Sequence, residues 1–258
     1  MKKDKTKFFF DSVASNYSKR YKCEDNRSIF FNNRLNFSLN SEDFQNKSVL
    51  DIGAGSGIIY HCLKNVLAKY TGCDISEKMM KEGGIPKNSR RIIENNLEEL
   101  LKNEKYDYIF MLGVTTYLSK EQFESYINQI INCSNNGTKV IISYTLKNYI
   151  HIIWRQFITT LSRTILRPFL KRKKLLINSG IQMTRHYAQD CLNISMNLKV
   201  YDYNFQNIFL PPFDRILPRK ILLFIDKAAN RFIGQKIIKF LGSDLSVKYV
   251  YQGDNYKI

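Results

Sequence analysis

The sequence predicts an α/β fold in which a mostly parallel β-sheet is covered by helices on both faces. Short apolar runs typical of buried strands lie at 48–52, 70–74, 90–94, 106–112 and 138–144. Helical patterns lie between them at 57–68, 76–82 and 120–133. Alternating strands and helices of this kind form parallel sheets. A glycine-rich turn follows the first strand, at the carboxyl edge where such sheets bind their ligands.

The first strand runs directly into that turn. Asp51 lies near the end of the strand, and glycines follow at alternate positions, at Gly53, Gly55 and Gly57. Glycine is needed where the backbone bends sharply and where a ligand must approach it closely. The helical pattern that comes next would offer free backbone N–H groups to a polar ligand. The turn therefore predicts a site for a nucleotide-like cofactor.

The glycine spacing indicates which kind of cofactor to expect. The dinucleotide fingerprint is G-x-G-x-x-G, whereas this chain has G-x-G-x-G with an acidic residue before the first glycine. A carboxylate that faces the turn suits a cationic ligand better than a pyrophosphate, and S-adenosylmethionine carries both an ammonium and a sulfonium. Asp74 ends the second strand, 23 residues after Asp51. An acid in that place accepts hydrogen bonds from the hydroxyls of a ribose.

Several motifs in order resemble those of class I S-adenosylmethionine-dependent methyltransferases. Phe10-Asp11-Ser12-Val13-Ala14-Ser15-Asn16-Tyr17 resembles the N-terminal F-D-x-x-A-x-x-Y helix of that family. The segments 106–114 and 135–142 resemble its fourth strand and the glycine turn into its fifth. The resemblance covers residues 8 to 145, and the chain is most similar to the small-molecule branch that includes the ubiquinone and menaquinone C-methylases.

The resemblance implies a Rossmann-like sheet of seven strands whose last two strands are swapped into an antiparallel edge. Residues 1–46 would form a helical lid, 47–145 the cofactor-binding core, and 146–258 basic helical insertions with the last two strands of the same domain. The patterns agree with this division. We expect helices at 149–170 and 184–196, a strand at 197–205, basic amphipathic structure at 217–241 and a last strand at 244–252.

The resemblance also implies the cofactor-binding residues. Asp51 would hold the amino end of the cofactor, and Asp74 its ribose. The implied set is Asp51, Gly53, Ala54, Gly55, Gly57, Asp74, Ile75, Asn96, Leu97, Leu112 and Gly113. In this set Asn96 replaces the usual aspartate that bonds the adenine amine, and Asn95 is the alternative. An amide oxygen can still accept that bond. Leu97 would offer its backbone N–H to the ring, and Gly113 would border the methyl group.

The catalytic residues are predicted from position. His151 follows the fifth strand at the carboxyl edge, where a general base would lie, and an ordinary surface histidine is the alternative. Tyr17 resembles the tyrosine of the family's N-terminal helix near the transferred methyl group, and by this resemblance it would orient the substrate, with simple packing as the alternative. His186 is a similar case to His151, and His61 is expected to be structural. The fourth strand lacks the N-P-P-Y type of motif, which argues against methylation of DNA adenine or glutamine and favours oxygen or carbon acceptors.

The net charge of +17 lies mainly in the C-terminal part. Residues 151–258 hold 18 Lys and Arg against 6 Asp and Glu, whereas residues 48–150 are balanced. The basic amphipathic segments, with Trp154 as an anchor, favour a small or lipid-linked acceptor and contact with an anionic membrane surface, and a solvated helix face is the alternative. Two alternatives stay open. One is an RNA methyltransferase, with nucleic acid as a less favoured partner, and the other is a non-catalytic cofactor-binding or membrane-surface protein.

Five cysteines without metal spacing predict reduced thiols and no metal. No apolar run approaches the roughly 18 residues of a membrane span, so we expect a cytoplasmic protein, peripheral at the inner membrane surface.

Overall fold

The structure is a computed structural model that describes residues 2–17, 26–93, 97, 101, 103–161, 183–209, 217–229 and 234–253. Within these ranges no helix combines the length and the apolar character needed to cross a bilayer. Asn95 and Asn96, which were predicted to meet the adenine ring, lie outside the described residues, as does 162–170 of the helix expected at 149–170.

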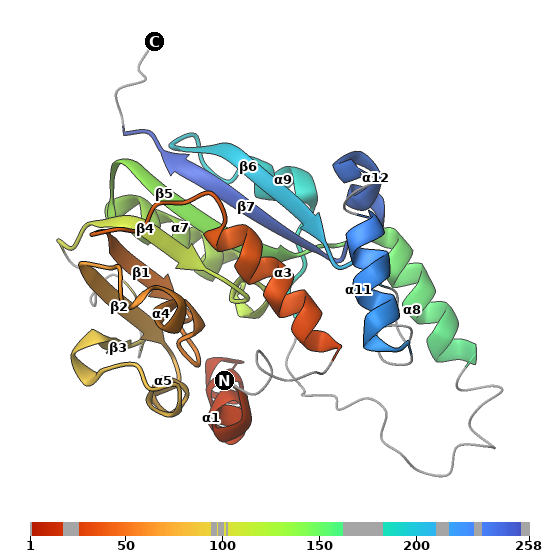
Figure 1. The fold of residues 1–258 in the computed structure, drawn as a ribbon, viewed down its shortest axis with the longest axis horizontal. Coiled ribbons are helices and arrows are strands. Elements are labelled where there is room, and N and C mark those ends of the chain that lie inside the picture. The colour runs from red at the N-terminus through yellow and green to blue at the C-terminus, as the bar shows by residue number, and fades with distance from the viewer. Residues whose placement is uncertain are drawn as a thin grey trace.

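Seven strands of the described part form one sheet in the order β3-β2-β1-β4-β5-β7-β6. They are β1 (Ser48–Ile52), β2 (Lys69–Asp74), β3 (Arg90–Ile92), β4 (Tyr106–Met111), β5 (Ser134–Thr145), β6 (Leu198–Gln206) and β7 (Asp244–Tyr251). Neighbours from β3 to β5 pair parallel, whereas β7 pairs antiparallel with β5 and β6. The predicted seven-stranded, mostly parallel sheet is thereby confirmed (Figure 1).

Side chains that alternate along the central strands divide the core into two clusters. Leu50, Ile109 and Ile142 belong to one cluster, and their neighbours along the chain, such as Val49 and Phe110, belong to the other. Successive residues of a strand point to opposite faces, so a strand that is apolar throughout must be covered on both sides. Helix α7 (Lys120–Asn132) packs on the first face and α4 (Ile58–Leu63) on the second.

Helix α7 begins at the predicted position because its first turn is capped. The Ser119 hydroxyl accepts a hydrogen bond from the Gln122 backbone N–H over 3.2 Å, and the Gln122 side-chain oxygen accepts one from the Ser119 N–H over 2.9 Å. This reciprocal pair is a capping box, which satisfies two N–H groups that the start of a helix leaves open.

Other boundaries differ from the sequence prediction. The helix expected at 57–68 ends at Leu63, and the one expected at 184–196 is reduced to α9 (Ala188–Leu192) because His186 pairs with Leu146 as an isolated bridge. The segment 135–137, expected as a turn before the fifth strand, belongs to β5, whose pairing with β4 is irregular at that end. Long-range strand pairing replaces the local preference in the last two of these cases.

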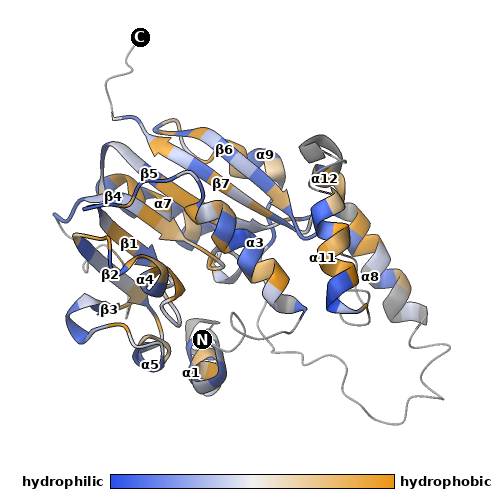
Figure 2. Ribbon diagram, in the orientation of Figure 1, coloured by the Kyte–Doolittle hydropathy of each residue, from blue (hydrophilic) through white to orange (hydrophobic). Residues whose placement is uncertain are grey.

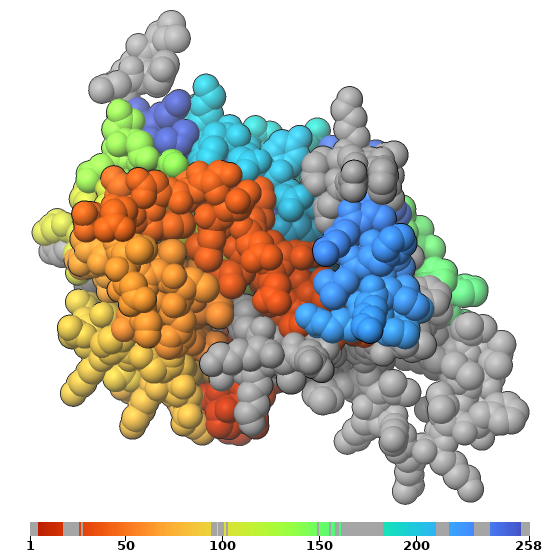
Figure 3. Space-filling model, in the orientation of Figure 1, coloured from red at the N-terminus to blue at the C-terminus, as the bar shows by residue number. Residues whose placement is uncertain are grey.

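The N-terminal region is helical as predicted, with α1 (Lys2–Tyr17) and α3 (Arg27–Leu39). The basic C-terminal segments form α8 (Tyr149–Leu161), α11 (Arg219–Ala228) and α12 (Gly234–Leu241), so the stretch predicted at 217–241 is two helices. Helices α3 and α11 lie side by side on the face seen in Figure 3, and Ile29 and Leu222 are buried between them. Short elements α5 (Glu77–Glu82), η1 (Lys87–Ser89) and η2 (Thr115–Tyr117) complete the described fold.

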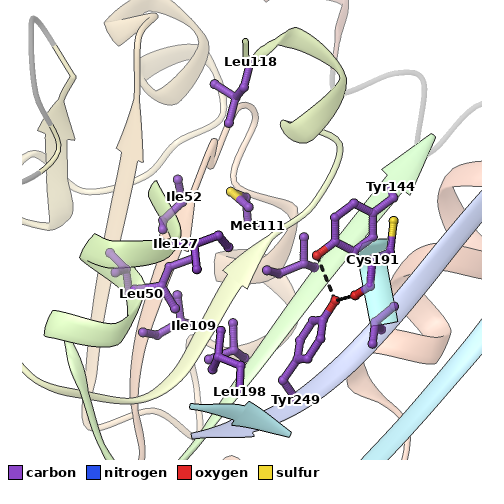
Figure 4. Close-up of a cluster of buried hydrophobic side chains, with 14 of the residues drawn as sticks. Leu50, Ile52, Ile109, Met111, Leu118, Ile127, Tyr144, Cys191, Leu198 and Tyr249 are labelled. Carbon is purple, nitrogen blue, oxygen red and sulfur yellow. Dashed lines mark hydrogen bonds between the residues drawn. The ribbon is translucent and has the colours of Figure 1, made fainter. Parts of the chain in front are cut away.

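A buried polar chain fixes β5, β7 and α9 to each other. The Tyr144 and Tyr249 hydroxyls lie 2.8 Å apart, and the Tyr249 hydroxyl donates to the backbone carbonyl of Cys191 (Figure 4). Buried tyrosines need a partner for each hydroxyl, and here each partner comes from a different element. The core is therefore specified by hydrogen bonds as well as by apolar packing.

A second buried polar cluster lies under the end of α3. Glu42 accepts from Lys248 Nζ at 2.9 Å, from Lys139 Nζ at 2.6 Å and from the Tyr201 hydroxyl at 2.8 Å. The side chains of Glu42 and Lys248 are each only 2% exposed. A buried lysine needs such a partner because an unpaired charge in the protein interior is costly.

Candidate cofactor and acceptor cavity

A cavity of about 520 Å³ opens where β1, β2 and β4 end. Eight of the predicted cofactor residues line it: Asp51, Gly53, Ala54, Gly55, Asp74, Ile75, Leu112 and Gly113. The N-terminal helices contribute Thr6, Phe10, Tyr17, Phe31 and Arg34. The other side is formed mainly by Val114, Thr116, Tyr117, Leu118, Glu121, Gln122, Ser125, Tyr126 and Met183. Both the strand edge and α1 with α3 therefore face one space.

The glycine turn has the backbone conformation that its sequence predicts. Gly53, Gly55 and Gly57 have φ angles of 78°, 51° and 71°, a left-handed region that other residues adopt at a cost. The Gly53 N–H donates to the Cys73 carbonyl over 2.7 Å, which fastens the turn to β2. Gly57 begins α4 and is not among the cavity-lining residues; a Cβ there would meet Ile85 at 2.7 Å. Its role in the structure is packing.

Asp51 is a buried carboxylate at the cavity, only 3% exposed. Its Oδ2 accepts a hydrogen bond from the Tyr70 hydroxyl over 2.8 Å. The pKa of Asp51 is raised to about 7, mainly by burial and also by the nearby Asp74, against the opposing effect of the Tyr70 hydrogen bond. A carboxyl group that is costly to ionise without a partner is suited to bind a cation.

Asp74 lies at the carboxyl end of β2, held by the backbone of two turns. Oδ2 accepts from the Gly55 N–H and Oδ1 from the Ser76 N–H, each over 2.8 Å. Burial raises its pKa to about 6 in spite of these bonds. A carboxylate has about four acceptor positions, so Asp74 keeps capacity for ligand hydroxyls that face the cavity.

Other predicted residues lie away from the cavity. His151 is not among the cavity-lining residues, and its Nε2 lies 2.6 Å from the Leu241 carbonyl on α12, which argues against a role as general base. Leu97, predicted to offer its backbone N–H, is not among the cavity-lining residues, and its side chain is buried in the hydrophobic core. His186 packs between Phe123 and Tyr144, and His61 contacts the Gly83 carbonyl at 2.5 Å, a structural position as predicted. Tyr17 does line the cavity.

Sequence reasoning missed several cavity residues. Phe31 and Arg34 come from a helix that no motif marks, and Glu121, Gln122 and Tyr126 come from the first turns of α7. Their spacing on each helix is the signal, since positions three and four apart share one face. That signal does not say which face meets a ligand.

The thiols agree with the prediction as far as the structure describes them. Cys73, Cys133 and Cys191 are buried and free, whereas Cys62 is exposed. The described residues contain no group of three or more His, Cys, Asp or Glu side chains placed to hold a metal ion.

The sequence of this chain is similar to that of known proteins. A family described as methyltransferase domain matches residues 17–187. The ribosomal protein L11 methyltransferase of Fusobacterium nucleatum subsp. nucleatum is 38% identical over 79 residues, which are 28% of this chain and 25% of that protein. The chain thus matches about a quarter of the length of this curated relative.

Two solved structures share the fold. Magnesium protoporphyrin IX methyltransferase from Synechocystis PCC 6803, crystallised with S-adenosylhomocysteine, has a TM-score of 0.59 at 14% identity, covering 98% of this chain and 100% of that one. The N-methyltransferase NodS from Bradyrhizobium japonicum WM9, with the same ligand, has a TM-score of 0.58 at 12% identity, covering 96% and 99%.

Proposed function

The chain belongs to the family of methyltransferase domains, and on that premise we propose that it transfers a methyl group from S-adenosylmethionine to a small or lipid-linked acceptor. The observation that carries the proposal is the pair of buried carboxylates, Asp51 and Asp74, beside a left-handed glycine turn in one cavity. When bound, the cofactor supplies a methyl group on a positively charged sulfur and leaves as S-adenosylhomocysteine.

The residues present fit this cofactor. Asp51 would hold its ammonium group, since the carboxylate is buried and its pKa is raised to about 7. Asp74 would accept the ribose hydroxyls with the acceptor positions that Gly55 and Ser76 leave open. Ile75 would pack on the adenine, and Asn96 would accept from its amine. The assignments of Asp51, Asp74 and Ile75 follow from their positions at the strand edge, and that of Asn96 rests on the resemblance of the sequence alone.

The chain would contribute to the reaction mainly by positioning. Leu112 and Gly113 border the cavity between the cofactor turn and the aromatic side chains of α1, and Tyr17 would orient the acceptor there. Alignment of an acceptor atom with the sulfonium provides much of a methyl transfer rate. The resemblance of the sequence motifs to those of ubiquinone and menaquinone C-methylases favours a carbon or oxygen atom of the acceptor.

Calorimetry tests whether the protein binds S-adenosylmethionine. Wild-type protein should bind S-adenosylmethionine with a micromolar Kd, and Asp74→Ala should weaken binding by about 100-fold, as expected when two charge-assisted hydrogen bonds are lost. Asp202→Asn on the exposed part of β6 is the matched control and should leave the Kd unchanged. An absence of binding to wild type would reduce the proposal to a statement about fold.

The acceptor is tested by label transfer from methyl-labelled cofactor into a cell extract. Label in the organic phase supports a lipid-linked acceptor, and label in small aqueous products supports a soluble one. Label in RNA would favour the alternative of an RNA methyltransferase. If cofactor binds but no fraction acquires label, the chain is a cofactor-binding protein without turnover.

We also propose a peripheral position at the cytoplasmic membrane surface. Helices α8, α11 and α12 gather at one end of the molecule (Figure 1), and parts of α8 and α11 are coloured as hydrophobic in Figure 2. The three helices carry the exposed apolar side chains Ile150, Ile153, Phe157, Ile221, Phe224 and Phe240. The exposed isoleucines favour the interface of an anionic bilayer over RNA, because an aliphatic side chain is buried by lipid but does not stack on a base as an aromatic ring does.

Sedimentation with vesicles tests this surface. The protein should bind vesicles that contain phosphatidylglycerol and bind pure phosphatidylcholine much less. Phe224→Ser with Phe240→Ser should weaken the binding, because their side chains are 73% and 65% exposed. Phe8→Ser, at 76% exposure on α1, is the control for loss of an exposed phenylalanine elsewhere. Equal binding by all variants would contradict the proposed surface.

A further inference from the structure

The Arg34 side chain reaches from α3 over the end of β4. A Cβ placed on Gly113 would lie only 2.7 Å from Arg34 Nη1. The guanidinium therefore occupies the space that a side chain at position 113 would fill. Gly113 has a φ of 74°, and its N–H donates to the Ser143 hydroxyl over 2.7 Å. Arg34 and Gly113 both line the cavity. The guanidinium therefore lies where the acceptor would meet the cofactor.

Arg34 is only partly paired. Its Nη2 lies 3.5 Å from Asp244 Oδ1, which is a long distance for an ion pair. The other oxygen of Asp244 already accepts from Asn207 Nδ2 at 2.8 Å and from the Ser243 hydroxyl at 2.7 Å. Arg34 Nε is buried and has no hydrogen-bond partner among the residues that the structure describes. A buried donor in this state is costly, and a shift of the Arg34 side chain toward an anion in the cavity would relieve the cost.

The charges of the cavity are divided between its two sides. The carboxylates Asp51 and Asp74 lie at the cofactor turn, whereas Arg34 is the cationic side chain among the described lining residues. Glu121 is the remaining charged one, and its carboxylate accepts from the Ser119 hydroxyl over 2.7 Å at the solvent-exposed start of α7. Arg34 would thus supply the positive charge that an anionic acceptor needs in this cavity.

Aromatic side chains surround the same space. Phe10 and Tyr117 meet edge to face with ring centres 5.3 Å apart, and the guanidinium carbon of Arg34 lies 5.9 Å from the centre of the Phe31 ring. All four residues line the cavity. The surroundings suit an apolar or aromatic body that carries one charged oxygen group.

We propose that Arg34 forms an oxyanion subsite that binds a carboxylate or phosphate group of an apolar, aromatic acceptor. The inference rests on the proposed methyltransferase function and names its class of substrate. A planar guanidinium binds either group through two parallel hydrogen bonds, and lysine does not reproduce this geometry.

The test is a titration of the protein saturated with S-adenosylhomocysteine, followed by calorimetry or by chemical-shift changes. Benzoate and phenyl phosphate are the probes, and benzamide is their neutral counterpart. We expect at least one anion to bind about 10-fold or more tighter than benzamide, since a charged hydrogen bond in a closed site contributes that much. Comparison of the two anions identifies the preferred group.

Variants assign the effect to Arg34. Arg34→Gln should weaken binding of the anion by about 10-fold or more and leave the affinity for benzamide unchanged. Arg34→Lys should bind the anion with an affinity between those of wild type and Arg34→Gln, because lysine keeps the charge but lacks the planar guanidinium that forms two parallel hydrogen bonds. Lys199→Gln, exposed on β6, is the control for a change of net charge.

Two results separate the inference from its premise. Unchanged affinity for S-adenosylhomocysteine in Arg34→Gln shows that the variant is folded and that the cofactor site is intact. If wild type binds S-adenosylhomocysteine but prefers neither anion over benzamide, the oxyanion subsite is wrong and the methyltransferase proposal stands. If wild type does not bind S-adenosylhomocysteine, the proposed function itself fails.

Discussion

The Ser76 hydroxyl donates a hydrogen bond to Asp11 Oδ1 over 2.5 Å, and so joins the N-terminal helix to the turn after β2. Ser76 is also the N-cap of α5, where its oxygen accepts from the Met79 N–H over 3.1 Å. Its own N–H bonds Asp74 Oδ1. One serine therefore links the α1 helix, the α5 helix and the carboxylate proposed to hold the ribose.

Replacing Asp11 should loosen this link. Asp11→Ala removes the acceptor of the Ser76 hydroxyl, and we expect the Kd for S-adenosylmethionine to rise by about 5-fold to 10-fold, as for the loss of one charged hydrogen bond. Calorimetry measures the change. This tests residues 1–46 as a lid, because Asp11 itself is not among the residues that line the cavity.

Lys7→Ala is the control for that experiment. Lys7 Nζ pairs with Asp11 Oδ2 at 3.0 Å on the exposed side of the helix, and such surface pairs contribute little. Equal losses of affinity in both variants would assign the effect to helix stability rather than to the link with Ser76.

The raised pKa of Asp51 predicts opposite effects on stability and binding. A group whose pKa is raised on folding contributes stability at low pH and loses it as pH rises through the folded value, here about 7. Asp51→Asn should therefore make the ligand-free protein more stable than wild type at pH 8, by about 4 kcal/mol, with little difference at pH 4. Thermal unfolding at the two pH values measures this.

The same group should make cofactor binding depend on pH. Affinity of wild type for S-adenosylmethionine should increase from pH 5.5 to 7.5, because Asp51 must lose its proton to hold an ammonium. Asp51→Asn should bind weakly and show a smaller rise, because Asp74, whose pKa burial raises to about 6, still loses its proton in this range. Strong, pH-independent binding by Asp51→Asn would exclude the proposed contact.

Comparison of Gly53→Ala with Gly137→Ala separates the cost of a steric clash from the cost of backbone strain. A Cβ at Gly53 would lie 2.1 Å from Val114 Cγ2, in addition to the cost of a φ of 78°. Gly137 has a similar φ of 89°, and a Cβ there would meet nothing within 4 Å. Gly137→Ala should cost about 1 kcal/mol of unfolding free energy, whereas Gly53→Ala should cost about 3 kcal/mol and displace the turn. Denaturant unfolding and cofactor titration test both, and equal costs would contradict the clash.

Glu42→Leu should destabilise the fold strongly. It leaves Lys248, with a side chain 2% exposed, without its carboxylate, and removal of one partner from a buried pair costs about 3 to 5 kcal/mol. Glu124→Leu on α7 is the control, because its 3.9 Å pair with Lys120 is exposed and should cost less than about 1 kcal/mol. Denaturant unfolding compares the two, and similar losses would show that the buried pair contributes nothing special.

Local sequence determined the cofactor edge. The positions of the first five strands, the left-handed turn at Gly53 and Gly55, and the places of Asp51 and Asp74 at strand ends all follow from patterns within a few residues of each other. The alternation of side chains in a strand and the glycines of a turn are visible in short stretches of sequence. Ligands bind at the carboxyl ends of parallel strands, so an acid at such an end can also be recognised from the sequence.

Tertiary structure alone decided what faces that edge. His151 looked well placed from its position after β5, yet it contacts the Leu241 carbonyl, which lies on α12 far along the chain. Arg34 carried no motif, yet packing of α3 brings it over Gly113, 79 residues later in the sequence. Which face of a helix meets a cavity depends on long-range packing against other elements, and a helical pattern read from the sequence does not contain that information.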